Sequence, residues 1–245
     1  SIAFDRQIME EVTFSMEAGG KVAIVGPNGT GKTTILRDIY KNNNPAIKLA
    51  PDLKIAYLSQ MHGEVFNEKE TVLKNFEDAG FETEAEIVRY LKTYGFEEEL
   101  VYNKVENLSG GEKNLLQLAK ISRMDADFLL LDEPTNYLDA EHIAWLTRYL
   151  QEYENAFILI SHDIPFLNDV VNIIYHMENQ RLDRYVGNYD KFQEVYAVKK
   201  SQLEAAYRKQ QQEISELKDF VARNKARVAT RNMAMSRQKK LDKMD

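Results

Sequence analysis

The sequence predicts an α/β fold, and three observations support this prediction. Residues 22–25, 128–131 and 156–160 are short apolar runs, which are typical of strands buried in a sheet. Segments with apolar residues at helical spacing lie between these runs, for example residues 35–40 and 114–122. The first run also leads through a glycine-rich loop directly into a helical pattern, which is the order found in strand–loop–helix units.

The loop at residues 26–34 has the pattern Gly-x-x-x-x-Gly-Lys-Thr, which is typical of a phosphate-binding loop. Its glycines let several backbone N–H groups converge on phosphate oxygens, and the following helix adds the positive end of its dipole. Lys32 can neutralise the β- and γ-phosphates, and the Thr33 hydroxyl can ligate Mg²⁺. We therefore predict a nucleoside triphosphate site that comprises Gly26, Asn28, Gly29, Gly31, Lys32, Thr33 and Thr34.

Composition narrows the class of protein. The 245 residues contain no cysteine, which excludes disulfides and thiolate metal sites. There is no signal-peptide pattern and no apolar run near the ~18 residues that a membrane span needs. We expect a cytoplasmic protein without a membrane domain. The chain begins without methionine and stops inside a charged helical pattern, which suggests a piece of a longer polypeptide.

The formal net charge of −7 is divided unequally along the chain. Residues 199–245 contain 13 Lys and Arg against 6 Asp and Glu, a balance of +7, which leaves −14 for residues 1–198. A basic tail on an acidic body predicts that the tail is the part that contacts a polyanion.

Further strands are predicted on both sides of the phosphate-binding loop. Residues 2–4 and 12–16 read as two short strands joined by a turn. Residues 54–58 alternate between apolar and polar side chains, like a strand, and end at Ser59 and Gln60.

A small helical subdomain is predicted over residues 70–122. Residues 70–104 are strongly acidic and have apolar residues at helical spacing. The next helix, residues 114–122, is preceded by Ser109, a suitable N-cap, and Glu112 three residues later completes a capping box. A capped, glycine-bearing helix start can bind an anion, although an ordinary capped helix has the same local pattern.

Two predicted strands end in residues that suit catalysis. Asp132 and Glu133 follow the run at 128–131. An aspartate at this place can hold Mg²⁺ through water, and the adjacent glutamate can polarise an attacking water as general base. His162 lies just beyond the run at 156–160, where ligands gather in nucleotide-binding folds. Glu133 and His162 are thus the predicted catalytic residues.

In order and spacing, these motifs resemble the ATP-binding cassette (ABC) superfamily along nearly all of residues 1–198. The matching features are the phosphate-binding loop, Gln60, the signature Leu-Ser-Gly-Gly-Glu at 108–112, Asp132, Glu133 and His162. The resemblance implies a P-loop NTPase fold over residues 1–190, with a mixed sheet and a helical signature subdomain. It also implies hydrolysis of ATP with Mg²⁺ as cofactor.

The resemblance assigns further roles. Phe4 would stack on adenine. Gln60 would sense the γ-phosphate and would contact Mg²⁺ together with Thr33 and Asp132. Residues 136–139 would communicate across an interface with a second cassette, in the same polypeptide or in a dimer. The signature residues that would close on the ATP of that second cassette are Ser109, Gly110, Gly111 and Glu112. One cassette would therefore be half of an enzyme.

Two stretches resemble the ABC-F branch of this superfamily. Pro-Thr-Asn-Tyr-Leu-Asp at 134–139 is characteristic of it, and Tyr-Val-Gly-Asn-Tyr at 185–189 is typical of the end of its first cassette. ABC-F proteins have no transmembrane domain, and characterised members bind the ribosome near the tRNA exit site. The resemblance implies a translation factor whose partners are the ribosome, rRNA and tRNA.

A helical linker is predicted over residues 191–245, with a tip near 222–237. Six positions at heptad spacing form a predicted seam, and all but Gln210 are apolar. They are Leu203, Tyr207, Gln210, Ile214, Leu217 and Val221. Such a seam needs a partner helix, most simply one that returns antiparallel. Met233 and Met235 are assigned to the same seam.

The predicted tip is basic. Residues 220–241 contain no acid, and a basic tip without acids suits an RNA backbone. The predicted RNA-binding residues are Arg223, Lys225, Arg227, Arg231, Arg237, Lys239 and Lys240.

One interval departs from the ABC-F pattern. Only 77 positions separate Lys32 from Ser109, which leaves little room for the extra helical arm that first cassettes often carry there. The interval resembles an arm-less second cassette, whereas the tail resembles the linker that a first cassette leads into. Either this subgroup lacks the arm or the chain is truncated or hybrid.

Three other functions stay open at this point. The ATPase subunit of an ABC membrane transporter would dock on a membrane partner through Gln60 and the helical subdomain, a role that has no need of a basic tail. A DNA-repair or chromosome-organising cassette would insert its coiled coil between the phosphate-binding loop and the signature, whereas here the helical stretch follows His162. The third is a nucleotide-gated scaffold without turnover.

Overall fold

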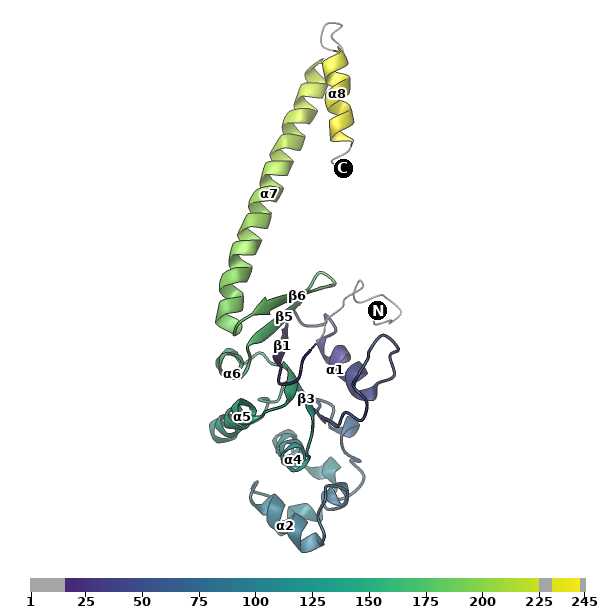
Figure 1. The fold of residues 1–245 in the computed structure, drawn as a ribbon, viewed down its shortest axis with the longest axis vertical. Coiled ribbons are helices and arrows are strands. Elements are labelled where there is room, and N and C mark those ends of the chain that lie inside the picture. The colour runs from purple at the N-terminus through teal and green to yellow at the C-terminus, as the bar shows by residue number, and fades with distance from the viewer. Residues whose placement is uncertain (1–15, 225–230, 243–245) are drawn as a thin grey trace. The chain divides into compact units, whose positions relative to one another are not determined.

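The computed structural model describes residues 16–224 and 231–242 and divides the chain into two compact units, residues 1–192 and 193–245. The first unit contains a six-stranded sheet with helices on both faces and a helical subdomain (Figure 1). The second unit contains most of one long helix and a shorter helix. The two strands predicted near the N-terminus, with Phe4, fall outside the described residues.

The sheet has the strand order β2-β3-β4-β1-β5-β6, and all neighbours pair in parallel except β5 and β6. The strands are β1 (Lys21–Val25), β2 (Ile55–Leu58), β3 (Phe128–Asp132), β4 (Ala156–Ile160), β5 (Ile173–Glu178) and β6 (Arg181–Val186). Leu58 is level with Leu131, and Asp132 with Ile160. The carboxyl ends of β1 to β4 therefore meet at one edge of the sheet, and the mixed sheet predicted from the resemblance is confirmed.

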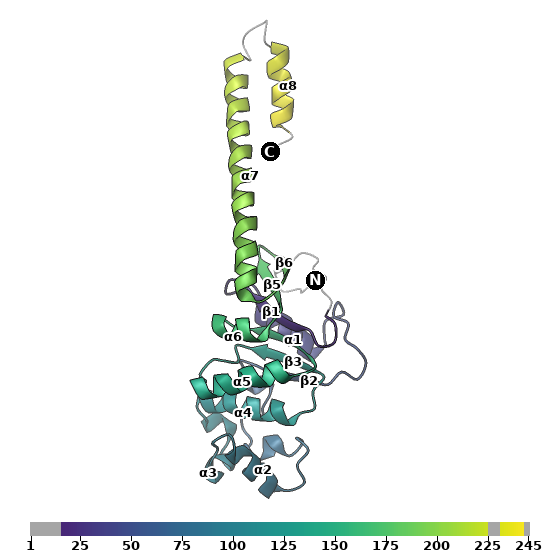
Figure 2. The same cartoon turned by 60° about the vertical axis from the view of Figure 1, so that its left-hand side comes forward.

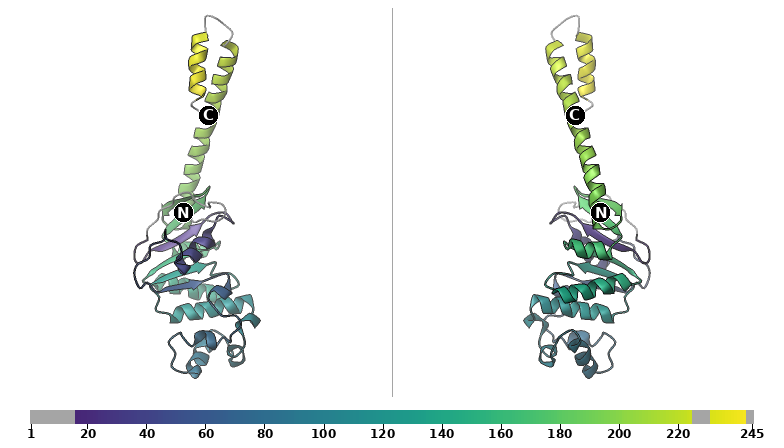
Figure 3. Two further views of the ribbon diagram at one scale, coloured as in Figure 1. Left: turned by 90° about the vertical axis from the view of Figure 1, so that its right-hand side faces the viewer. Right: turned by 90° about the vertical axis from the view of Figure 1, so that its left-hand side faces the viewer.

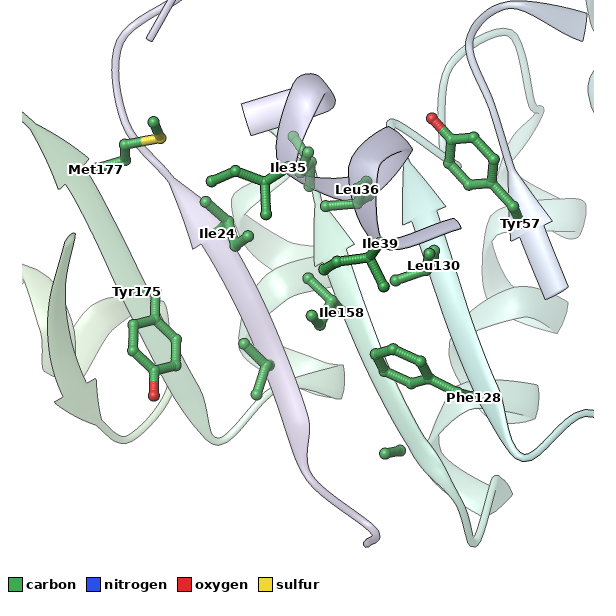
Figure 4. Packing of buried hydrophobic residues seen from close by; sticks show 13 residues of the cluster. Ile24, Ile35, Leu36, Ile39, Tyr57, Phe128, Leu130, Ile158, Tyr175 and Met177 are labelled. Atoms are coloured by element: carbon green, nitrogen blue, oxygen red, sulfur yellow. The ribbon is translucent and has the colours of Figure 1, made fainter. Parts of the chain in front are cut away.

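One face of the sheet is covered by α1 (Lys32–Lys41), which follows the glycine-rich loop. Its buried side chains Ile35, Leu36 and Ile39 pack on alternate residues of the strands, such as Ile24 and Ile158 (Figure 4). Successive side chains of a strand point to opposite faces, so every second residue reaches this cluster. Since the intervening residues are buried too, the central strands are apolar throughout, which is why the sequence showed them as continuous runs.

The other face is covered by α4 (Gly110–Arg123), α5 (Ala140–Glu152) and α6 (Ile164–Val170), as the two opposite views of Figure 3 show. α5 packs beside α6, and α4 contacts the edge strand β2. The predicted helix at 114–122 is thereby confirmed.

The helical subdomain has a core of its own, which includes the fully buried Phe76 and Phe96 and, from α4, Leu116. Besides one face of α4, it is built from short helices: η1 (His62–Glu64), η2 (Lys74–Phe76), α2 (Glu84–Lys92), α3 (Glu98–Val101) and η3 (Val105–Asn107). The helical periodicity predicted for residues 70–104 thus corresponds to several short helices around one core.

A row of aromatic rings connects this subdomain to α5. Neighbouring ring centroids along the row are 5.2 to 5.9 Å apart. In order, the rings are Phe81, Tyr90, Tyr94, Trp145, Tyr149 and Tyr153. Tyr94 and Trp145 meet edge-on, at an interplanar angle of 81°, where the subdomain and α5 touch. Contacts of this geometry add stabilisation beyond the apolar area that they bury.

The β5–β6 hairpin was not predicted from the sequence. Its two-residue turn, Asn179-Gln180, has φ values of 49° and 62°. Positive φ at both positions is the requirement of the tight hairpin turn whose twist matches the strands. Asn tolerates this conformation, whereas Gln180 is an unusual residue for it, and β6 is largely exposed and charged, so both sequence signals for the hairpin are weak.

In the C-terminal unit, α7 (Tyr189–Asn224, which begins in the first unit) and α8 (Arg231–Leu241) lie side by side near the far end of α7 (Figure 2). The buried residues between them are Ile214, Leu217, Val221, Ala234 and Leu241. The predicted helical return is therefore confirmed, and so are the last three apolar positions of the predicted seam.

One prediction about this seam was wrong. Met233 and Met235 are 54% and 55% exposed, because Ala234, between them, takes the inner position and Leu241 lies seven residues further on the same face. Leu203 and Tyr207 are exposed, at 72% and 61%, but the described part of the returning helix ends before reaching them, so their place in the seam stays a prediction.

Candidate nucleotide-binding and catalytic site

The sheet brings the predicted site residues to one edge. Gly26, Gln60, Glu133 and His162 each follow the carboxyl end of a parallel strand within two residues. In open α/β sheets, ligands bind outside these ends. The glycine-rich loop then enters α1, and among the described residues no side chain caps the N-terminus of that helix. Its first N–H groups are thus available to an anion.

Three glycines give the loop its shape. Gly26, Gly29 and Gly31 have φ values of 149°, 77° and 99°, in the region that side chains disfavour. At Gly26 there is a further constraint, because a Cβ atom would lie 2.2 Å from the carbonyl oxygen of Met177 on β5. The unpredicted strand β5 therefore lies directly against the loop, and any other residue at position 26 would push the two apart.

Lys32 lies in the centre of the loop. Its ammonium donates hydrogen bonds to the carbonyl oxygens of Gly26 and Pro27, both at 2.8 Å, and the residue is buried. Burial lowers the pKa of Lys32, while the charges of Glu133 and Asp132 act in the opposite direction. The ammonium therefore lies close to the place where the loop would hold phosphates.

Asp132 is 1% exposed, and neither of its carboxylate oxygens completes a hydrogen bond within the described residues. Burial raises its pKa to about 6, while the Thr33 hydroxyl beside it acts to lower the pKa. Unpartnered buried oxygens are costly unless a ligand satisfies them. A carboxylate next to a threonine hydroxyl is a donor set that suits Mg²⁺, which keeps waters and phosphate oxygens as its other ligands.

Glu133 and His162 are in direct contact. The backbone N–H of His162 donates to Oε2 of Glu133 at 3.2 Å, and His162 Nε2 lies 3.2 Å from Oε1. Glu133 is 7% exposed, whereas the imidazole is largely exposed. The pair places a buried carboxylate behind an accessible imidazole at the edge where phosphates would lie. This arrangement suits water activation by Glu133 and charge stabilisation by His162.

The signature segment begins α4. The predicted capping box is confirmed: Ser109 Oγ accepts from the N–H of Glu112 at 3.3 Å, and Glu112 Oε2 accepts from the N–H of Ser109 at 2.7 Å. The hydrogen bonds that the Ser109 hydroxyl and the Ser109 backbone N–H donate to the Glu112 carboxylate lower the pKa of Glu112. Ser109 and Gly110 are exposed, so this capped end faces outward and can meet another molecule.

The loop after β3 is attached to this helix. The Asn114 side chain donates to the carbonyl oxygen of Asn136 at 2.5 Å, and a Cβ on Gly111 would lie 3.2 Å from the carbonyl oxygen of Tyr137. Tyr137 itself has a φ of 63° and is 78% exposed. The expected interface loop and the signature thus form one surface.

The remaining predicted site residues are Gln60 and the basic residues of the C-terminal unit. Gln60 is exposed after β2. In α8, Arg237 stacks on the Phe220 ring with 3.6 Å between guanidinium carbon and centroid, and Lys240 pairs with Glu213 at 2.5 Å. Arg223 lies 3.9 Å from Asp219, and Lys239 is exposed. Lys225, Arg227 and the side chain of Arg231 fall outside what the structure describes.

Two features are absent from the described residues. No helix there combines the length and the low polarity that a membrane span requires. No group of three or more His, Asp and Glu side chains there is arranged to hold a metal ion without other ligands.

Family comparisons agree with this geometry. Two family models, both described as ABC transporter, match residues 9–136 and 175–245. The uncharacterized ABC transporter ATP-binding protein YfmM of Bacillus subtilis (strain 168) is 46% identical over 98% of this chain and 55% of its own length. Elongation factor 3 of Pneumocystis carinii is 34% identical over 78% of this chain and 19% of its own length.

Probable ATP-binding protein YheS of Escherichia coli (strain K12) is 30% identical over 98% of this chain and 43% of its own length. The chain spans about half the length of the curated relatives that it matches end to end.

Two solved structures share the fold. The ATP-binding cassette MJ0796, a dimer in a post-hydrolysis state with ADP and Pi, has a TM-score of 0.56 and 21% identity over 73% of this chain and 90% of its own. The archaeal ribosome recycling factor aABCE1, in complex with the ribosomal stalk protein aP1, has a TM-score of 0.56 and 28% identity over 74% of this chain and 37% of its own. The chain therefore belongs to the ABC transporter family, as an ATP-hydrolysing ABC domain with ABC-F-type relatives.

Proposed function

We propose that this ABC domain is part of a cytoplasmic ABC-F translation factor that acts on the ribosome near the tRNA exit site. ATP and Mg²⁺ would close it on a second cassette, and closure would set the position of the basic helical linker against tRNA and rRNA. The observation that carries the proposal is the acid-free basic segment 220–241 on a helical hairpin that continues from an ATPase domain.

Relatives add support. Elongation factor 3 is named as a translation protein, and aABCE1 is described as a ribosome recycling factor bound to a ribosomal stalk protein. Electrostatic attraction between Lys and Arg side chains and phosphates supplies most of the non-specific affinity for nucleic acid. A basic hairpin whose own core is formed by Leu217 and Leu241 could present such charges on a preformed support.

Within the ATP site, the residues divide the work. Lys32 and the N–H groups at the start of α1 would hold the phosphates. Asp132, Thr33 and Gln60 would hold Mg²⁺, Gln60 would also sense the γ-phosphate, and the bound ion would supply charge neutralisation. Glu133 would accept the proton of the attacking water, and His162 would stabilise the charge that develops on the γ-phosphate. Ser109 and the glycines after it would contact the ATP of the second cassette.

The test is co-sedimentation with ribosomes. The full-length protein carries Glu133→Gln, with the equivalent change in any second cassette, so that bound ATP is retained. ATP-dependent pelleting is expected. It should be lost when four basic residues of the tip, Arg223, Lys225, Arg227 and Arg231, are changed to Ala. Arg237 and Lys240 are left intact, because they contact Phe220 and Glu213 within the hairpin.

A matched control removes the same charge from the shaft of α7, through Lys199, Lys200, Arg208 and Lys209 changed to Ala. If both variants pellet equally poorly, the contact is a general charge effect and the tip is not the site. A trapped protein that stays in the supernatant would contradict the ribosomal role, and membranes and DNA would then be tested in the same assay.

A further inference from the structure

One face of α4 fastens the segment that carries Gln60. Three of its side chains, at positions 113, 117 and 120, point the same way, since residues three and four apart are neighbours on a helix. Lys113 pairs with Glu68 at 2.8 Å, and Lys120 donates to the carbonyl oxygen of Asn75 at 3.0 Å. Gln117, between them, reaches the residues on either side of Gln60.

The contacts of Gln117 are specific. Its Oε1 accepts from the N–H of Ser59 at 2.8 Å, and its Nε2 donates to the carbonyl oxygen of Ser59 at 3.0 Å. The same Nε2 lies 2.8 Å from Nδ1 of His62. Gln117 is fully buried, and both donor hydrogens and the acceptor of its amide are used. The two contacts with Ser59 fix the orientation of the amide, since exchanging its oxygen and nitrogen would break both of them.

The position of Ser59 explains why its backbone needs the hydrogen bonds from Gln117, which we call the Gln117 clamp. β2 is an edge strand, and its parallel ladder with β3 ends at Leu58. Ser59 is buried, so the next backbone N–H and C=O groups need partners that the sheet does not supply. Gln117 provides both. On its other side, the Ser59 hydroxyl donates to Glu64 at 2.8 Å, and Glu64 pairs with Arg37 of α1 at 2.6 Å.

We propose that Gln117 is a positioning residue for ATP hydrolysis, because it fixes the backbone from which Gln60 reaches the nucleotide. The inference rests on the proposed role of Gln60 at the γ-phosphate and metal. It also connects two motifs: Gln117 lies eight residues after Ser109, which is about 12 Å along a continuous helix. A shift of the signature end would therefore be transmitted to Gln60 through the Gln117 amide.

A double-mutant cycle tests this. In the full-length protein, with the equivalent of Glu133 in any second cassette changed to Gln, the Mg²⁺-ATP hydrolysis parameters are measured for Gln60→Ala, Gln117→Met and the double variant. Met has nearly the size of Gln but cannot make its hydrogen bonds. We expect Gln117→Met to lower kcat about tenfold and to raise the Mg²⁺ concentration for half activity, while KM for ATP changes less than threefold. The double variant should be no slower than Gln60→Ala, since residues that act as a unit are not additive.

The control is Lys120→Met, on the same helix face, which loses its contacts with Asn75 and with the Phe66 ring but leaves Ser59 untouched. Its kcat should stay within twofold. A kcat loss in Lys120→Met equal to that in Gln117→Met, or additive losses in the cycle, would overturn the positioning role. If Gln60→Ala has full activity while Gln117→Met does not, the result contradicts the proposed role of Gln60. It then also contradicts the positioning role of Gln117, which depends on Gln60.

If Gln117→Met does not fold, Gln117→Glu is the second variant. It keeps the size and the acceptor for the Ser59 N–H, but at neutral pH it has no donor for the Ser59 carbonyl oxygen. Amide hydrogen exchange of residues 59–62 should be faster in this variant than in the unchanged protein. Unchanged exchange, together with unchanged kcat, would refute the clamp.

Discussion

At Glu133 the backbone adopts a left-handed conformation, with φ of 51°. This region is uncommon outside glycine and costs on the order of 1–3 kcal/mol, so the surrounding structure must hold it. The N–H of Glu133 donates to the carbonyl oxygen of Ile160 at 2.8 Å, and the following Pro134 disfavours the right-handed helical alternative. The strain aims the carboxylate at His162 instead of into the sheet.

The first prediction concerns this carboxylate. Glu133→Gln keeps its size and can keep the hydrogen bond from the N–H of His162, so affinity for ATP should change little. Without a base, kcat should fall about 10²- to 10⁴-fold. Equilibrium binding and single-turnover hydrolysis measured on the same preparation check both halves. Turnover at the unchanged rate would remove Glu133 from the role of base.

The second prediction concerns Asp132. Burial raises its pKa from 3.8 to about 6, so the folded state prefers the protonated form. The free energy of unfolding should fall as pH rises from about 4 to about 6, and stay level above that range. In EDTA and without nucleotide, Asp132→Asn should stabilise the fold at pH 7.5 by on the order of 2–3 kcal/mol, and the advantage should shrink towards pH 5.

Urea unfolding at several pH values measures this difference. The comparison with the unchanged protein cancels the titration of the other groups that the two proteins share. Two curves of the same shape, offset by a constant, would mean that Asp132 does not titrate in this range.

At the scale of elements, the sequence predicted the strands and helices whose own residues form a recognisable pattern. Three of the strands that end at the site, β1, β3 and β4, are buried on both faces and appear in the sequence as continuous apolar runs, whereas β2 was predicted from its alternating pattern. The capping box at Ser109 is a local motif and was found for the same reason. β6 has one buried residue, Tyr185, and exposed charges, so pairing with β5, and not its own composition, makes it a strand.

The helical hairpin shows a second limit of sequence patterns. Ile214, Leu217 and Val221 were predicted correctly on α7, where six spaced positions define the seam. On α8 the prediction assigned Met233 and Met235 to the seam, whereas the buried residue is Ala234, whose small side chain allows the helices to approach closely. Which face of a short helix turns inward depends on the connection before it, and that is a tertiary property.

A matched pair of substitutions tests this hairpin. Leu217→Ala removes a side chain that is 9% exposed and packs with Leu241, so the amides of α8 should exchange with solvent more rapidly. Leu203→Ala makes the same chemical change in the same helix, where the side chain is 72% exposed, and should leave α8 unaffected. Hydrogen exchange with mass spectrometry compares the two. Equal protection of α8 in both variants would contradict the observed packing.

At the scale of the molecule, the proposed function makes this chain one side of a shared site. Its signature end and Tyr137 are exposed and adjacent, and together they form a surface that faces outward. Tyr137 also holds a left-handed φ of 63°. An exposed aromatic residue in a strained turn is costly for an isolated domain, which favours a role in contact with a second cassette.

Tyr137→Gly should separate these two properties. Glycine relieves the left-handed strain, so the melting temperature should stay the same or rise. In a Glu133→Gln background, ATP-dependent closure of the cassettes, followed by small-angle scattering, should become weaker. A variant that closes normally would show that Tyr137 does not contact the second cassette.

The structure of the interval between Lys32 and Ser109 bears on the predicted lack of room for an extra helical arm. In the structure, the interval between Lys32 and Ser109 is occupied by α1, β2 and the helical subdomain, whose core includes Phe76 and Phe96. No segment of this interval is left over to form an arm.

The aromatic row has a practical consequence. Trp145 is the only tryptophan of the chain, and it lies between Tyr149 on its own helix and Tyr94 of the helical subdomain. Any rotation of that subdomain against the sheet must change the edge-on contact of Tyr94 with the indole. The fluorescence of Trp145 can therefore report this rotation. ATP should alter tryptophan emission, and Tyr94→Leu should abolish the change while ATP binding persists. If tryptophan emission does not change when ATP is added, the subdomain and α5 move together as one body.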